Sequence, residues 1–154
     1  MHIFEQNIKN LNIDIPDISP PLANYVSYKI SDKLIFLAGQ GPIKNGSVMY
    51  KGKVGVDITE VEGIKAAELC CINIIANLKS ALNSEWEKID HFVKLGGFVN
   101  CKSDFTNHPQ IINGASDLLV KIFGEKGKHA RFAVGSNSLP MDIAVEIDAI
   151  VKII

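Results

Sequence analysis

The chain has 154 residues, 47% of them hydrophobic and 21% charged, a balance that suits one packed domain able to bury its core without disulfides. Its formal net charge of −1 provides no field to attract a nucleic acid or an anionic membrane surface, so we expect neither partner. A long apolar run and a basic signal-like start are both missing from the sequence, which predicts a cytoplasmic protein.

The three cysteines, Cys70, Cys71 and Cys101, lack the spacing of a zinc or redox motif. We expect all three to be reduced thiols that pack in the hydrophobic core. The four histidines also lack metal-ligand spacing, and no carboxylate cluster completes a site for a hard metal. The sequence therefore predicts no metal and no cofactor.

Residues 1–22 are interpreted as an N-terminal extension ahead of a domain at 23–154. Phe4, Ile8 and Leu11 recur at helical spacing, which predicts a short helix. An extended arm should follow it, because the next segment holds three prolines, Pro16, Pro20 and Pro21.

Strands are predicted at residues 25–30 and 33–38, where β-branched and aromatic residues dominate. A polar turn between them makes the pair a hairpin. A second turn at 44–46 contains Asn-Gly, a pair that adopts positive φ readily, and a short strand is expected at 47–50.

Helices are predicted at residues 59–83 and 109–123, where apolar residues recur every three or four positions. Either Thr59 or Asp57 can cap the first helix. A buried strand at 91–100 separates the two helices, and its Gly96-Gly97 pair indicates a bulge or a close backbone approach.

Two final strands, at residues 130–137 and 142–153, complete the chain. The order is then strands, helix, strand, helix and two strands. This order predicts an α+β fold in which the two long helices pack on one face of a mixed sheet.

Arg131 is the first candidate for chemistry, because a charged residue inside the apolar run Phe132-Ala133-Val134 needs an anionic partner. A guanidinium grips a carboxylate at two points, so a ligand carboxylate is one possible partner. Glu146 or Asp148 of the same chain is the other, in an ion pair that would serve folding alone.

Glu146 is the second candidate, and its strand allows two interpretations. Alternation along 142–153 favours a solvated face, whereas a desolvated carboxyl would have a raised pKa and could hold or activate a water. Asn113 and Gly114 are weak helix formers early in the second helix, which either directs the amide to a pocket or delays the helix start.

These residues, taken together, resemble the RidA family, also called YjgF. The blocks that carry the resemblance are Asn24-Tyr25-Val26, Phe36-Leu37-Ala38-Gly39-Gln40, Gly97-Phe98-Val99-Asn100, Asn113, Ala130-Arg131, Leu139-Pro140 and Val145-Glu146-Ile147-Asp148-Ala149-Ile150. They follow the family's order from about Tyr25 to the end of the chain, and the N-terminal extension suits a longer subgroup.

The resemblance implies a chorismate-mutase-like fold, a homotrimer, and a pocket in each cleft between subunits. It implies hydrolysis of 2-imino acids and enamines to 2-keto acids and ammonia. Arg131 then matches the arginine that binds the substrate carboxylate, and Glu146 the glutamate that positions a water. Tyr25 matches the tyrosine that lines the cleft, Asn113 the asparagine near it, and Gly39 the glycine of the strand turn.

Two departures from the family pattern keep a second function open. Active deaminases of the family usually have a serine and a cysteine where this chain has Ala38 and Ala133. The alternative is a non-catalytic protein that senses keto acids or related carboxylates. A chorismate-mutase-like rearrangement rests on fold analogy alone, and the net charge argues against the endoribonuclease label that the family has carried.

Overall fold

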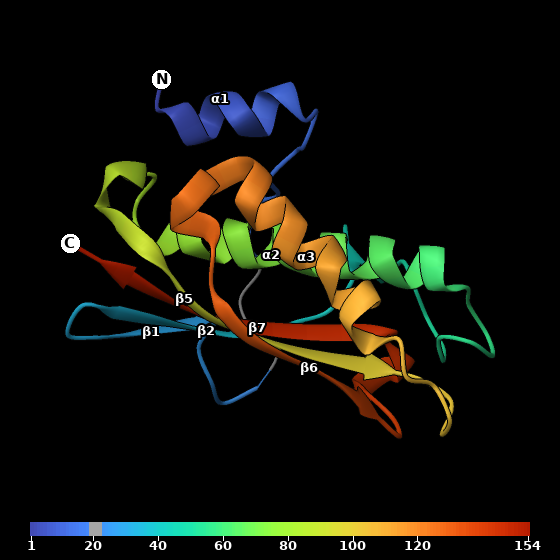
Figure 1. The fold of residues 1–154 in the computed structure, drawn as a ribbon. Coiled ribbons are helices and arrows are strands. Elements are labelled where there is room, and N and C mark those ends of the chain that lie inside the picture. Colours follow the sequence, from blue (N-terminus) through green and yellow to red (C-terminus); the bar gives the residue numbers. More distant parts are fainter. Residues whose placement is uncertain (19–22) are drawn as a thin grey trace.

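A five-stranded sheet with helices on one face forms the body of the computed structural model, which describes residues 1–18 and 23–154 (Figure 1). The helices are α1 (Ile3–Asn10), α2 (Glu60–Ala81) and α3 (His108–Phe123). The main sheet contains β1 (Tyr28–Ser31), β2 (Leu34–Gln40), β5 (Ile89–Asn100), β6 (Ala130–Ser136) and β7 (Val145–Ile153). A separate hairpin pairs β3 (Ile43–Lys44) with β4 (Ser47–Val48). Short 3-10 turns occupy Trp86–Lys88, Gly124–Gly127 and Pro140–Asp142.

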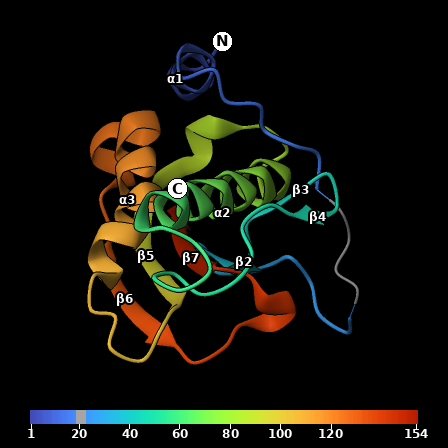
Figure 2. The same ribbon diagram turned by 90° about the vertical axis from the view of Figure 1, so that its right-hand side faces the viewer.

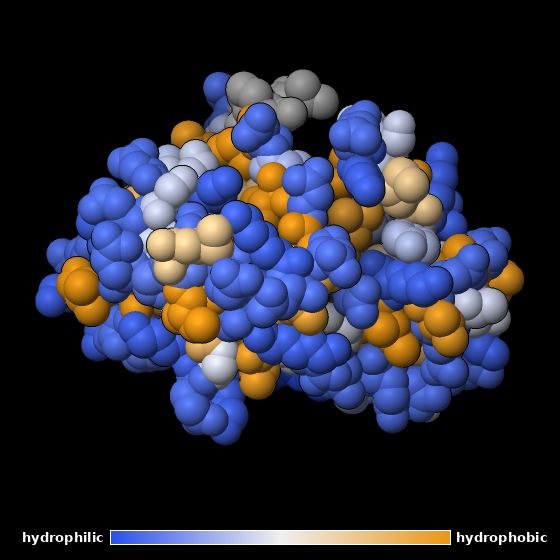
Figure 3. Space-filling view, turned by 90° about the horizontal axis from the view of Figure 1, so that it is seen from above, coloured by the Kyte–Doolittle hydropathy of each residue, from blue (hydrophilic) through white to orange (hydrophobic). Residues whose placement is uncertain are grey.

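The strand order is β1-β2-β7-β5-β6, and every neighbouring pair is antiparallel except β5 and β6. Helices α2 and α3 lie side by side on one face of this sheet, and α1 packs beyond them (Figure 2). The predicted α+β mixed sheet with two long helices on one face is therefore confirmed. The outer surface of the helix layer is mostly hydrophilic, with separate apolar patches (Figure 3).

The two faces of the sheet differ in burial. On β7, Val145, Ile147 and Val151 are fully buried against the helix layer. The alternate residues Glu146 and Asp148 lie on the opposite face, which no helix of the described chain covers. This second face is called the open face below.

Capping and packing explain where α2 forms. Thr59 accepts a hydrogen bond from the backbone N–H of Glu62 at 3.2 Å, and the Glu62 carboxylate accepts one from the Thr59 N–H at 2.7 Å, which makes a capping box. Further along, the free thiols of Cys70 and Cys71 are fully buried, and burial raises the pKa of both above the usual thiol value. These two cysteines are core residues, as predicted.

The glycine pair in β5 marks a close approach and not a bulge. A Cβ at Gly96 would lie 2.3 Å from Asp148 Oδ1, and one at Gly97 would lie 2.7 Å from the side chain of Ile112 in α3. The register of β5 shifts nearer its start, at 89–91 and 92–94. Gly97 therefore lets α3 approach the sheet closely.

Two strand boundaries predicted from hydrophobicity are wrong. The first strand begins at Tyr28, three residues later than expected. The last strand begins at Val145, because the residues from Pro140 to Asp142 form a 3-10 turn with positive φ at Met141 and Asp142. Proline has no N–H to donate to a ladder, and a left-handed residue interrupts extended backbone.

Helix α1 packs on the same core as the rest of the chain. The Phe4 ring lies 4.9 Å from that of Phe123 between centroids, and Asn7 donates to the Ile122 carbonyl at 2.7 Å. The predicted short helix is present and Ile8 is buried, but Leu11 follows the end of the helix and is 39% exposed. Of the arm's prolines, Pro20 and Pro21 lie outside the described residues. No described helix is long and apolar enough to cross a membrane.

This packing predicts that Phe4→Ala lowers the free energy of unfolding by about 3 kcal/mol, because it removes a buried aromatic ring and leaves a cavity. Urea denaturation of the whole chain measures the loss. Ile3→Ala is the matched control on the same helix, since Ile3 is 60% exposed and its truncation should change stability by less than about 0.5 kcal/mol. Equal stability of the two variants would show that α1 does not stabilise the fold.

Candidate functional site

Glu146 lies on the open face, half-buried beside Gly39 of β2. A Cβ at position 39 would lie 3.0 Å from Glu146 Oε1, so glycine leaves the space that this carboxyl occupies. Burial raises the pKa of the Glu146 carboxyl, and the neighbouring negative charge of Asp148 raises it further. Glu146 thus lies on the uncovered face that alternation predicts, and its carboxyl is partly desolvated there.

A cavity of about 790 Å³ opens in front of this carboxyl. Glu146, Gly39 and Tyr25 line it together, although they come from three separate segments of the chain. Its other walls come from the N-terminal arm at 14–18, the β3–β4 hairpin, α2 and the turn before β7. The size suits a small metabolite, and the lining mixes apolar and polar groups as ligand pockets do.

Arg131 lies on the other side of the sheet. Its Cα pairs with that of Leu95 in β5, a residue fully buried beneath the helices. The guanidinium donates from Nη1 to Ser116 Oγ at 3.1 Å and from Nη2 to the Pro109 carbonyl at 3.4 Å, so two groups of α3 hold it at the sheet edge. Three of the five N–H donors of a guanidinium remain for a ligand.

His129 extends this arrangement by a further hydrogen bond. Its Nε2 lies 2.9 Å from Ser116 Oγ, and its Nδ1 lies 2.7 Å from the Gly127 carbonyl. A carbonyl can only accept, so the network assigns the proton to Nδ1. Ser116 then donates to His129 and accepts from Arg131, and the chain of hydrogen bonds orients the guanidinium. Ser116 was missed in the sequence, where a lone serine within a helix gives no signal.

The predicted ion pair of Arg131 with Glu146 or Asp148 is wrong. None of the salt bridges among residues 1–18 and 23–154 involves Arg131. The reason is geometric, because both carboxylates lie on the open face and the guanidinium lies on the helix face. Arg131 therefore has no carboxylate partner in the described part of the chain.

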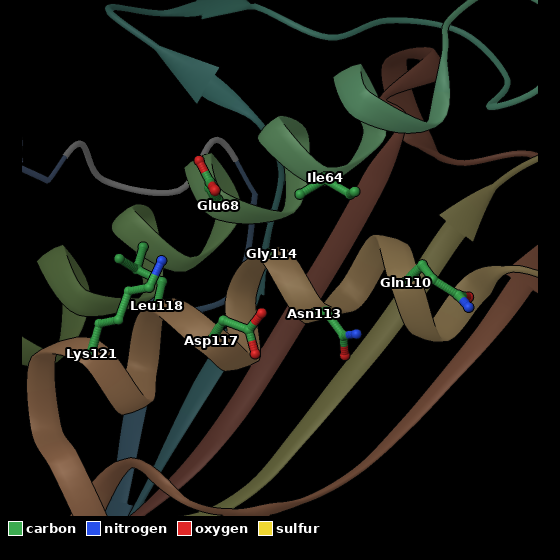
Figure 4. A pocket seen from close by; sticks show the side chains of 8 residues that line it. All are labelled: Ile64, Glu68, Gln110, Asn113, Gly114, Asp117, Leu118 and Lys121. Carbon is green, nitrogen blue, oxygen red and sulfur yellow. The ribbon is translucent and has the colours of Figure 1, made fainter.

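Asn113 lines a second, smaller cavity of about 310 Å³ between α2 and α3 (Figure 4). The groove also receives Glu68 from α2 and Asp117 from α3. Asn113 is three residues before Ser116, so it shares a side of α3 with the group that holds Arg131. The five candidate residues thus fall into two groups. Tyr25, Gly39 and Glu146 line one cavity, whereas Asn113 lies on α3 and Arg131 of β6 is held against that helix.

The two alanines that depart from the family pattern, Ala38 and Ala133, add no polar group to either group of candidate residues. Ala133 lies on the face of β6 that carries Arg131, and Ala38 lies one residue before Gly39. Among the described residues, no three His, Cys, Asp or Glu side chains come together.

Comparison with known proteins agrees with this fold. A family model described as YjgF/chorismate mutase-like, with an endoribonuclease label, matches residues 5–150. Protein TCP17 of Trypanosoma cruzi is 38% identical over 148 residues, covering 96% of this chain and 92% of that protein. The chain belongs to the YjgF family, here also called RidA.

Solved structures extend the comparison. The protein Atu1372 from Agrobacterium tumefaciens, of unknown function, is 42% identical with a TM-score of 0.91, covering 98% of this chain and 92% of its own. TdcF of E. coli, solved with bound serine, shares the fold at 18% identity and a TM-score of 0.58, covering 86% of this chain and 91% of its own.

The raised pKa of Glu146 predicts the pH dependence of its replacement. Folding favours the protonated carboxyl, so the parent keeps this stability below the usual carboxyl pKa and loses it as pH rises through the raised value. Glutamine does not titrate. The stability of Glu146→Gln relative to the parent should therefore increase from about pH 4 to about pH 7, as measured by urea denaturation.

Glu87→Gln removes the same charge at an exposed position and serves as the control. The opposite trend in Glu146→Gln, with relative stability falling as pH rises, would contradict a desolvated carboxyl.

Proposed function

We propose that this protein hydrolyses 2-imino acids to 2-keto acids and ammonia at a site completed by a second copy of the chain. In this proposal Arg131 and Asn113 come from one copy, and Glu146, Gly39 and Tyr25 come from its neighbour. The observation that carries the proposal is that the sheet separates Arg131 from Glu146. Arg131 has no carboxylate partner among the described residues, and Glu146 is a partly buried carboxyl with a raised pKa. Membership of the YjgF family supports it.

The open face of the sheet supports association between copies, and the family resemblance makes the proposed assembly a homotrimer. Phe36, Phe98 and Val134 lie on this face and are 43%, 39% and 41% exposed. Phe98 pairs with Glu146 across β5 and β7, so the apolar surface is continuous with the site. Large apolar side chains gathered on one surface favour contact with another protein surface, and symmetric self-association is the commonest form.

The chemistry requires little from the protein. Arg131 binds the substrate carboxylate at two points and orients the imine carbon. A water held by Glu146 adds to that carbon and breaks the C=N double bond, while the nitrogen takes up protons. The C–N bond of the tetrahedral adduct then breaks, which releases ammonia and leaves the keto acid. A carboxyl with a raised pKa can accept and return a proton near neutral pH.

The serine bound to TdcF supports a ligand of amino-acid size in this fold. The endoribonuclease label receives no support from the charge of this chain, whose net value of −1 gives no attraction for a polyanion.

A non-catalytic binding protein is the second candidate, and a specific observation favours it. Ala38 and Ala133 place methyl groups where deaminases of the family usually have hydroxyl and thiol groups. The same pocket would then hold a keto acid without turnover. Decay of an imine generated by a pyridoxal-phosphate enzyme, set beside direct titration with keto acids, separates hydrolysis from binding alone.

Arg131→Ala should abolish keto-acid binding, and Arg131→Lys should lose most of it although the charge remains. A lysine cannot reproduce a two-point grip, worth roughly 2 to 3 kcal/mol or on the order of a thirty- to hundred-fold change in affinity. Calorimetric titration and melting temperature are measured on the same proteins. If Arg131→Ala melts many degrees lower but binds the keto acid as tightly as the parent does, Arg131 stabilises the fold and does not bind the ligand.

A mixed assembly tests whether two copies share the site. Arg131→Ala and Glu146→Gln chains should each be inactive alone. When they are co-expressed, about one interface in four should receive both intact residues and recover activity, if copies assemble at random. A mixture as inactive as either variant would show that each site lies within one copy.

A further inference from the structure

The turn before β7 holds Met141 in a conformation that methionine rarely adopts. Met141 has φ 56° and ψ 19°, and the next residue, Asp142, also has φ 56°. The left-handed region brings Cβ close to the backbone and costs roughly 1 to 2 kcal/mol per residue. Aspartate tolerates it through local hydrogen bonds, whereas methionine has no such compensation. The surrounding structure must therefore maintain this turn.

A polar network around the buried Asn100 provides that support. Asn100 is fully buried, and its Nδ2 donates to Asp142 Oδ1 at 3.1 Å and to the Ile143 carbonyl at 3.2 Å. Its Oδ1 accepts from Lys53 Nζ at 3.0 Å. The backbone N–H of Gly52 donates to the Asp142 carbonyl at 2.7 Å. Three hydrogen bonds thus hold the turn and offset its strain, and a fourth, from Lys53, holds Asn100 itself.

The turn presents an apolar side chain to the cavity that contains Glu146. Met141 is 63% exposed, yet it is among the residues that line this cavity. The neighbouring Pro140 and Ile143 line it too, so the turn contributes one apolar wall beside the carboxyl. A thioether is flexible and polarizable, and it adapts to apolar groups of varied shape.

We infer that Met141 determines specificity by contacting the side chain of the substrate, and that Lys53 and Asn100 position it through Asp142. The ligand class is 2-imino and 2-keto acids with an apolar side chain, for which the cavity of about 790 Å³ has room. This inference rests on the proposed function, because the ligand is assumed to place its carboxylate at Arg131 and its reacting carbon near Glu146.

Met141→Gly tests the inference, because glycine accepts the left-handed conformation and removes the side chain. The melting temperature should rise by about 3 °C as the strain is relieved. The Kd for 2-oxohexanoate should rise roughly tenfold with the loss of a buried apolar contact, while the Kd for pyruvate stays within about twofold. Met141→Gly is thus expected to raise the melting temperature while it weakens binding of the longer keto acid alone. Replacing a residue with a purely structural role would not change the ratio of the two Kd values.

Asp32→Gly is the matched control. Asp32 has φ 51° in the β1–β2 turn and does not line the cavity, so its replacement relieves a similar conformation without altering either Kd. Lys53→Met tests the positioning network. It should weaken 2-oxohexanoate binding in the parent, and it should add no further loss in Met141→Gly, because Lys53 acts through Met141.

Three results would overturn the inference: an equal change in both Kd values, no change in either, or a loss of self-association in Met141→Gly, which would assign the side chain to an interface between copies. An imine-decay assay on the parent protein distinguishes failure of this inference from failure of the proposed function. A parent that binds 2-oxohexanoate through Met141 but hydrolyses no imine contradicts the enzyme and supports the specificity residue. A parent that binds neither keto acid contradicts both.

Discussion

The alternation of side chains along β-strands is the constraint on which the arrangement of this protein depends. Each strand directs successive residues to opposite faces of the sheet, and only one face is covered by helices. The pairing of Arg131 with Leu95 directs the guanidinium to the helix face. The pairing of Glu146 with Phe98 keeps the carboxyl on the open face. One copy of the fold therefore separates the two charged groups that a carboxylate-binding hydrolase needs together.

Each half of the candidate site is organised before any ligand arrives. Gly39 leaves the space that the Glu146 carboxyl occupies, and burial there raises the pKa of that carboxyl. On the other side, Ser116 and the Pro109 carbonyl hold the guanidinium of Arg131, and His129 orients Ser116. Preorganised groups lose less entropy when a ligand binds, so both halves suit a small ligand with few contacts.

The fold itself leaves the activity open. One fold can carry different chemistry, so the function of this chain has to be argued from the residues that line its cavities. In this chain, the N-terminal arm and the turn at Met141 form walls of the larger cavity.

The sequence by itself determined the class of fold and the candidate residues. Helical spacing in α2 and α3 and alternation in β7 are local properties of the chain, so the α+β sheet and its helix layer could be predicted. Local context singled out Arg131, Glu146 and Asn113, and the family resemblance added Tyr25 and Gly39. Boundaries near prolines were less certain, and the turn at Pro140 shortened the last predicted strand.

Only the tertiary structure decided which groups meet. Strand register depends on pairing between segments far apart in the chain, and a shift of one residue would turn Arg131 to the open face. Sequence alone therefore could not exclude the ion pair with Glu146, nor find that Ser116 supports the guanidinium. The same holds for Met141, whose backbone conformation is imposed by the buried Asn100 and not by its own preference.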